Sequence, residues 1–154
     1  MVTQFTWKTK AFSRRFEIYQ YTSKVGELRK VSLSRKTDGE MNGEKFVFKN
    51  KGFIKQETLI TNPDNDSVLG TISFKTFKSK ATILYNDKEY IWQFDNFFRT
   101  KWSVSNENGP LIKYHSRNFN GTIDSFTSDE LLVLTGFFIR NYKKQKSSEA
   151  AAAS

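Results

Sequence analysis

The most informative segment of the sequence is Thr127-Ser-Asp-Glu-Leu-Leu-Val-Leu-Thr-Gly-Phe-Phe-Ile139. From Leu131 onward it is apolar or small on every side of a helix, whereas a surface helix keeps one polar face. A nine-residue helix rises only about 13 to 14 Å, which is too short to cross a bilayer. We therefore predict a helix that is buried inside the fold. Its predicted buried residues are Leu131, Leu132, Val133, Leu134, Gly136, Phe137, Phe138 and Ile139.

The start of this helix carries the spacing of a capping box. In that motif the Thr127 hydroxyl accepts a hydrogen bond from the Glu130 amide, and the Glu130 carboxylate accepts one from the Thr127 amide. Gly136 costs about 1 kcal/mol relative to Ala in a helix interior, so we predict that it permits close approach of a strand. Cations then follow toward the negative end of the helix macrodipole. They are Arg140, Lys143, Lys144 and Lys146.

Residues 145–154 contain no large apolar side chain. We predict a frayed, flexible tail there, following a single domain of residues 1–144. A chain of 154 residues fits one domain with a substantial core.

The chain before the helix consists of short runs with strand-like composition, and the alternation in Phe16–Gln20 is typical of them. The other predicted strands are 28–34, 45–49, 53–60, 68–77, 81–85, 89–94, 101–105 and 111–116. Turn residues separate them at Gly26, 37–40, 42–43, 50–52, 62–66, 86–88 and 106–110. The strongest hairpin is 81–94, in which Ile83 and Tyr85 are expected to face Tyr90 and Trp92. Such a meander closes into a barrel or stacks as a sandwich to hide its edges.

The composition is basic and lacks cysteine. Lys and Arg total 25 against 16 Asp and Glu, which gives a net charge of +9. This charge favours anionic partners, although a solvated basic surface explains it equally well. Without Cys there is no disulfide, thiolate metal site or Cys nucleophile. The first ten residues lack the apolar run of a signal peptide, so we expect a cytoplasmic protein, peripheral to a membrane if lipid is its ligand.

The order of short strands followed by one apolar helix resembles the tubby C-terminal-like superfamily, in particular its LURP-one-related and scramblase-like branch. The resemblance is sharpest from Ser73 to Lys144, in Lys80-Ala-Thr-Ile, Tyr90-Ile-Trp, Lys101-Trp-Ser-Val, Leu111-Ile-Lys-Tyr and residues 129–142. It implies a closed antiparallel barrel of about 12 strands around the C-terminal helix. Tubby domains bind phosphoinositide headgroups and scramblases are linked to calcium and lipid. No tubby headgroup motif is present, so no binding residue is carried over.

Motifs of catalysis are absent from the sequence. His115 is the only histidine and stands outside any nucleophile-and-base spacing. Glycine-rich phosphate loops are missing, and the acidic residues of Asp64-Asn-Asp66 lack the spacing of a calcium loop and are read as a turn. We therefore expect a noncatalytic, monomeric binding module without cofactor or metal.

Basic residues form clusters around 8–15, 29–36, 75–80 and 143–146. Lys78 and Lys80, in a predicted turn, are expected to share one rim with Lys143, Lys144 and Lys146 at the helix exit and to meet anionic lipid headgroups there. Two alternatives stay open. One is a structural or protein-interaction module without a lipid ligand. The other, less favoured, is single-stranded nucleic acid stacking on aromatic residues such as Phe77, Tyr85, Trp92 or Phe97.

Overall fold

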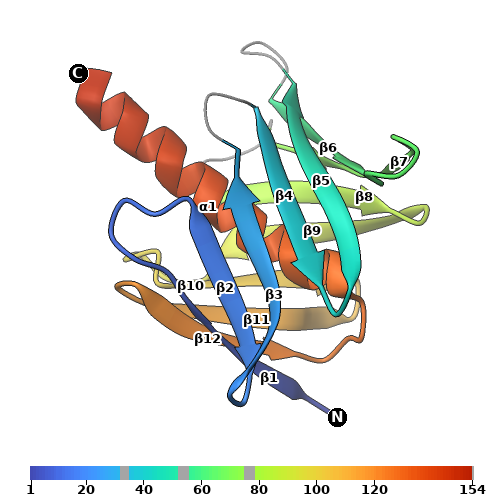
Figure 1. Cartoon of the computed structure of the whole chain (residues 1–154), viewed down its shortest axis with the longest axis horizontal. Helices are drawn as coiled ribbons and strands as arrows, with labels where there is room; N and C mark the ends of the chain where they lie inside the picture. The colour runs from blue at the N-terminus through green and yellow to red at the C-terminus, as the bar shows by residue number, and fades with distance from the viewer. Residues whose placement is uncertain (32–34, 52–55, 75–78, 154) are drawn as a thin grey trace.

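The computed structural model describes residues 1–31, 35–51, 56–74 and 79–153. In these residues twelve strands form one antiparallel meander, and β1 pairs with β12 to close it into a barrel (Figure 1). The strands are β1 (Thr3–Lys8), β2 (Arg15–Gln20), β3 (Ser23–Lys30), β4 (Lys36–Met41), β5 (Glu44–Lys51), β6 (Glu57–Thr61), β7 (Val68–Ser73), β8 (Lys80–Tyr85), β9 (Lys88–Phe94), β10 (Lys101–Asn106), β11 (Gly109–Arg117) and β12 (Asn120–Ser125). The predicted mainly β barrel around a C-terminal helix is confirmed.

Helix α1 (Glu130–Ala153) runs through the barrel, and every residue from Leu131 to Arg140 is buried. The strands supply the surrounding core by alternation, because every second side chain points inward. The core is aromatic: Trp7, Trp92 and Trp102 are at most 1% exposed. The helix therefore replaces the ligand cavity or channel that larger barrels enclose.

The beginning of α1 differs from the predicted capping box. Thr127 Oγ1 accepts a hydrogen bond from the Asp129 amide at 3.2 Å, not from the Glu130 amide. Asp129 Oδ1 instead accepts from the amides of Leu131 and Leu132, at 3.1 and 3.4 Å. The Glu130 carboxylate accepts from Asn42 Nδ2 on the β4–β5 turn. The capping box is thus wrong and Asp129 is the N-cap, since its carboxylate both caps the amides and complements the macrodipole.

The end of α1 also differs from the sequence expectation. Residues 145–153, expected as a frayed tail, continue the helix. Gln145 Nε2 donates to Glu149 Oε1 at 3.0 Å, and Lys146 Nζ lies 3.4 Å from Glu149 Oε2. These pairs and the following alanines, the best helix formers, extend the helix beyond the barrel.

Two segments predicted as turns lie inside strands. Gly26 is within β3 opposite Met41, and residues 37–40 belong to β4. A Cβ added to Gly39 would lie 3.1 Å from the Leu28 and Phe48 side chains and 3.5 Å from that of Leu134 on the helix. Glycine at position 39 therefore leaves room for core packing against α1. Strands β1 and β12, which close the barrel, were not predicted.

The β8–β9 hairpin has a shorter turn than predicted. Asn86 and Asp87 both have positive φ, 53° and 57°, as a two-residue type I′ turn requires. Ile83 faces Tyr90, whereas Trp92 faces Ala81 and Tyr85 faces Lys88. The predicted register is therefore wrong by two residues, because the turn has two residues instead of four.

The predicted close approach at Gly136 involves β10 and β11. A Cβ at this position would overlap the Tyr114 ring and hydroxyl and lie 2.8 Å from Val104 Cγ2. Tyr114 Oη donates to the Val133 carbonyl at 2.8 Å, and Trp92 Nε1 donates to the Gly136 carbonyl at 2.9 Å. The missing side chain thus lets the barrel wall hydrogen bond to the helix backbone.

The two ends of the barrel differ in their relation to the helix. At the entry end, Glu130 and Asp129 contact Asn42 and Tyr85 in the β4–β5 and β8–β9 hairpins. This end comprises residues 1–2, turns 21–22, 42–43, 62–67, 86–87 and 107–108, segment 126–129, and the adjoining strand ends. At the exit end α1 emerges from the barrel (Figure 1). This end comprises loops 9–14, 95–100 and 118–119 and the adjoining strand ends. It also includes the described residues of the β3–β4, β5–β6 and β7–β8 connections, which are 31, 35, 56, 74 and 79.

Candidate functional site

Cations occupy the strand ends at the exit end of the barrel. The residue at this end of β1, β2, β3, β4, β5, β8, β10 and β11 is Lys8, Arg15, Lys30, Lys36, Lys51, Lys80, Lys101 and Arg117, respectively. The described connections add Lys10, Arg14, Arg35 and Arg99. In the described loops and terminal strand positions of this end, the carboxylates are Glu57 and Asp95. The clusters that are separate in sequence therefore converge on one end.

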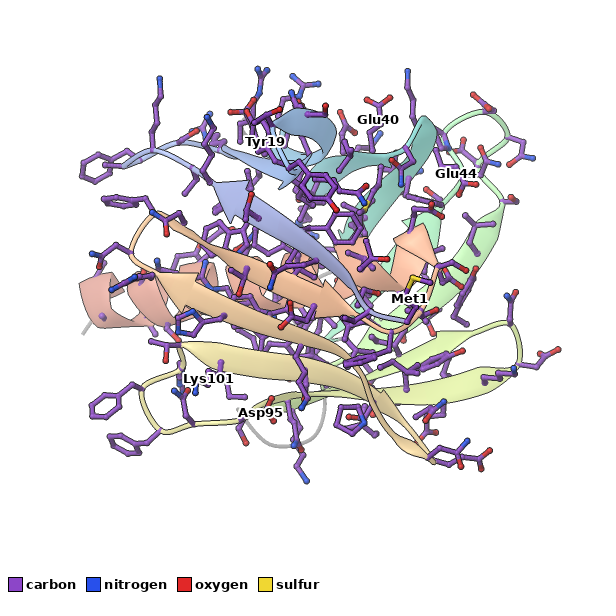
Figure 2. All side chains as sticks on the ribbon, turned by 90° about the horizontal axis from the view of Figure 1, so that it is seen from below. Met1, Tyr19, Glu40, Glu44, Asp95 and Lys101 are labelled. Carbon is purple, nitrogen blue, oxygen red and sulfur yellow. The ribbon has the colours of Figure 1, made fainter. Side chains whose placement is uncertain are left out.

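The entry end has the opposite charge. Its described turns and terminal strand positions carry Glu44, Asp64, Asp66, Asp87, Glu107 and Asp129, against the cation Lys88 and the terminal amine. Figure 2 shows Lys101 toward the side from which the helix emerges and Glu44 on the other side of the barrel. The net positive charge of the chain is thus concentrated at the exit end rather than spread over the surface.

Phenylalanines project from three loops of the exit end. Phe12, Phe97, Phe98 and Phe119 are 105, 92, 82 and 50% exposed. The entry end also exposes apolar side chains, including Tyr21 and Phe126. What distinguishes the exit end is that its exposed aromatic side chains stand among cations.

The predicted ligand-binding lysines lie at this end. Lys80 is the first residue of β8, and Lys143, Lys144 and Lys146 lie on the emerging part of α1. Lys146 pairs with Glu149, while Lys143 Nζ lies over the Phe74 and Trp92 rings, 5.5 and 5.6 Å from their centroids. Lys78 lies outside the described residues. The shared location is as expected, whereas the binding role of these lysines stays a prediction.

Burial and mutual repulsion lower the pKa values of cations at this end. Burial, followed by the nearby Arg99, lowers the pKa of Lys143 to about 8. Burial and Arg140 lower the pKa of Lys144, and burial is the main cause of the lowered pKa of Lys30. An anion that approached these groups would relieve the repulsion and raise their pKa values.

The aromatic residues considered for nucleic-acid stacking do not form one platform. Trp92 is fully buried, and Tyr85 is half-buried at the entry end, where its hydroxyl donates to Asp129 Oδ1 at 3.5 Å. Phe97 is exposed at the exit end, and Phe77 lies outside the described residues. Two of the named residues are therefore not available as exposed stacking surfaces at the basic end.

Two further features of the described residues concern metal binding. In the described part of the chain, no group of three or more His, Asp or Glu is arranged to hold a metal ion. The segment 62–67 is a turn, in which Asn62 Oδ1 accepts from the Asp64 amide at 2.9 Å and the Asn62 carbonyl accepts from the Asp66 amide at 2.8 Å.

No family model matches the chain, and no curated protein or solved structure is significantly similar to it. The relation to the tubby C-terminal-like superfamily thus stays a prediction. The described part of α1 contains no stretch that is both long and apolar enough to span a membrane.

The sequence pointed to Phe97 as a possible stacking residue, but not to Phe12, Phe98 and Phe119 or to the cations at the strand ends. A signal was present, because Phe97 and Phe98 are adjacent in a polar segment. Lysines and arginines also stand at the same end of eight of the twelve strands, but this pattern is visible only once the strand boundaries are known. No pattern in the sequence around Arg140 indicated that it would stack on Trp7 and Trp102.

Proposed function

We propose that this protein is a noncatalytic module that binds anionic membrane surfaces, through phospholipid headgroups, with the exit end of its barrel. The observation that carries the proposal is the coincidence of exposed phenylalanines with strand-terminal cations at one end. The proposed surface includes Lys80, Lys143, Lys144 and Lys146, with Lys78 assigned to it from its sequence position alone.

Both kinds of side chain contribute to such binding. Each Lys or Arg held near an anionic leaflet contributes about 1 kcal/mol. A Phe side chain that leaves water completely contributes about 1.5 to 3 kcal/mol, and partial insertion contributes a fraction of this. Cations alone give binding that is lost at high salt, whereas inserted aromatic rings retain part of it.

The predicted membership of the tubby C-terminal-like superfamily is a second part of the proposal. Its support is the closed barrel around a buried C-terminal helix, together with the motifs between Ser73 and Lys144. The proposed lipid surface does not depend on it, since that surface rests on the side chains of this chain.

The test is cosedimentation of the purified protein with phosphatidylcholine vesicles, with and without phosphatidylglycerol, at about 0.15 M salt. We expect sedimentation only with the anionic vesicles, and persistence of binding with single-stranded oligonucleotide as competitor. Displacement of the protein from the vesicles by the oligonucleotide would support nucleic acid as the ligand instead. Failure to bind either vesicle would contradict the proposal and favour a protein partner.

A pair of matched variants assigns the binding to one end. Phe97→Ser with Phe98→Ser removes two exposed rings from the exit end, and Tyr21→Ser with Phe126→Ser removes two from the entry end. We expect the first pair to weaken binding at least tenfold and the second to leave it unchanged. Equal effects of the two pairs would show that exposed aromatic area, rather than this end, controls binding.

A further inference from the structure

Arg140 is a buried cation without a carboxylate partner. Its side chain is held in the barrel with the residue only 5% exposed, and Cζ lies 5.4 and 5.1 Å from the ring centroids of Trp7 and Trp102. Within the described chain, its hydrogen bond runs from Nη1 to Asn141 Oδ1 at 3.1 Å, and no ion pair is formed. The segments outside the description contain no Asp or Glu.

The charge of this guanidinium persists despite its burial. Burial lowers the pKa of Arg140 to about 10, so the group is protonated at neutral pH. A buried charge is costly unless it is paired, and stacking on two indole rings offsets only part of that cost. The guanidinium has five N–H donors, of which the Asn141 contact uses one. The guanidinium therefore has no anionic partner among the described residues.

Arg140 lines a cavity of about 610 Å³ at the exit end, between α1, loop 9–14 and turn 118–119. The other cations on its wall are Lys10, Arg14, Lys30 and Lys144, and no Asp or Glu is among its lining residues. This volume lies within the range of roughly 300 to 1,000 Å³ that is typical of small-molecule sites. The cavity connects the buried guanidinium with the end of the barrel that carries the positive charge.

The same cavity has an apolar wall. Phe16, Leu28, Phe138 and Tyr142 line it, and the exposed Phe12 and Phe119 belong to it as well. A small inorganic anion would contact only the cations, and a neutral hydrocarbon would leave Arg140 unpaired. A molecule with one anionic group and one apolar chain satisfies both.

We propose that this cavity binds a single anionic amphiphile, whose carboxylate or phosphate pairs with Arg140 and Lys144 while its alkyl chain lies along Phe16 and Phe138. The planar guanidinium fork suits both anions, since each accepts two parallel N–H hydrogen bonds. This inference goes beyond the proposed function, because the ligand enters from solution as one molecule and no membrane is required.

The test is isothermal titration calorimetry without vesicles. The four probes are decanoate and decyl phosphate below their micellar concentrations, decanol below its solubility limit, and inorganic phosphate. We expect both anionic amphiphiles to bind at least tenfold more tightly than decanol or inorganic phosphate. Indole emission is expected to change on binding, since Trp7 and Trp102 flank Arg140. Equal binding of decanoate and decanol would overturn the proposal, as would no binding of either anionic amphiphile.

Variants locate the anionic group. Arg140→Met keeps an unbranched, flexible stem and removes the guanidinium with its charge, so we expect at least a tenfold loss of decanoate affinity. Lys144 is at most partly buried, so Lys144→Gln is expected to preserve the fold and to reduce decanoate affinity about three- to tenfold. Lys146→Gln is the matched control, because Lys146 lies on the same helix outside the cavity lining. If Arg140→Met fails to fold, unchanged decanoate affinity in Lys144→Gln overturns the proposal.

The outcomes separate this inference from membrane binding. Binding of anionic vesicles without binding of decanoate or decyl phosphate would refute the cavity alone. Binding of the amphiphiles without binding of vesicles would refute the membrane proposal alone.

Discussion

The two ends of this barrel are built alike and charged oppositely. Both consist of short connections between antiparallel strands, and both expose aromatic rings, Phe97 and Phe98 at one end and Tyr21 and Phe126 at the other. The exit end carries the strand-terminal cations, and the entry end carries acidic turns. The helix macrodipole has the complementary orientation, with its positive terminus at the acidic end. The net charge of +9 is therefore distributed unevenly along the barrel axis, with the cations in excess at the exit end and the carboxylates in excess at the entry end.

The alternation of strand direction produces this separation. Cations that begin β2, β4, β8 and β10 and cations that end β1, β3, β5 and β11 occupy the same end, because consecutive strands are antiparallel. If consecutive strands were parallel, the cations that begin strands and those that end strands would lie at opposite ends of the barrel.

The largest effect is expected from Leu134→Asp, which disrupts the packing of α1 inside the barrel between the two ends. Leu134 is fully buried and packs beside Gly39 of β4. An unpaired carboxylate there should cost more than about 4 to 5 kcal/mol and prevent folding. Near-ultraviolet circular dichroism and thermal melting measure the loss, and Ala150→Asp on the exposed part of α1 is the control. A native spectrum and melting temperature for Leu134→Asp would contradict the buried-helix assignment.

The next effect concerns charge at the two ends. Lys101→Gln with Arg117→Gln removes two exposed cations from the exit end. Lys88→Gln with Lys45→Gln removes one exposed cation from the entry end and one from the second residue of β5, next to that end. At about 1 kcal/mol per cation, the first pair should weaken partition into phosphatidylglycerol vesicles about 30-fold. The second pair is expected to change it less than threefold. A similar loss in both pairs would mean that total charge, and not its position, controls binding.

A smaller effect is expected from pH. The pKa of Lys143 is lowered to about 8, so this side chain loses its charge between pH 7 and 9. Vesicle partition should fall by about two- to fivefold over that interval, and Lys143→Gln should abolish this part of the change. Folding stability should change in the opposite direction. Because the unfolded-state pKa is near 10.5, the unfolded chain binds more protons between pH 8 and 10.5, and the Lys143 contribution to stability rises with pH.

Chemical denaturation of the wild type and Lys143→Gln at pH 7, 8 and 9.5 measures that stability contribution. As pH rises, the free energy of unfolding of the wild type should increase relative to that of Lys143→Gln. The reverse trend would show that Lys143 is stabilised as a cation by its two aromatic neighbours.

The smallest effect is expected at the protruding end of α1. Glu149→Gln removes a charge that pairs with Lys146, and should cost only about 0.2 to 0.5 kcal/mol of local helix stability. Amide exchange of residues 145–153 should become faster, with no change in the melting of the barrel. Vesicle binding should not decrease, since the change removes a carboxylate from the exit end. A lower barrel melting temperature would show that the tail supports the core.

The prediction of the fold succeeded where residues interact with near neighbours. The all-round apolar run from Leu131 to Ile139 predicted a buried helix, and alternation in segments such as Phe16–Gln20 predicted strands. The prediction failed at Gly26 and Gly39, which lie within strands. A glycine that makes room for packing cannot be distinguished in the sequence from a glycine in a turn. Asp129 replaced Thr127 as the N-cap for a related reason, since both residues suit that position.

For the candidate site, the sequence supplied the lysines but not their surroundings. It grouped Lys80 with Lys143, Lys144 and Lys146, and these residues lie at the same end. Nothing near Arg140 in the chain indicates that Trp7 and Trp102 would flank it, because both contacts span long sequence separations.

Local patterns and residue counts are sufficient to predict the helix, the strand-rich composition and the excess of positive charge. The folded arrangement is needed to see that the strand-terminal cations share one end, that the acidic turns share the other, and that Arg140 faces a cavity. Barrel closure by β1 and β12 brings distant segments together, and that pairing depends on register and packing around the helix.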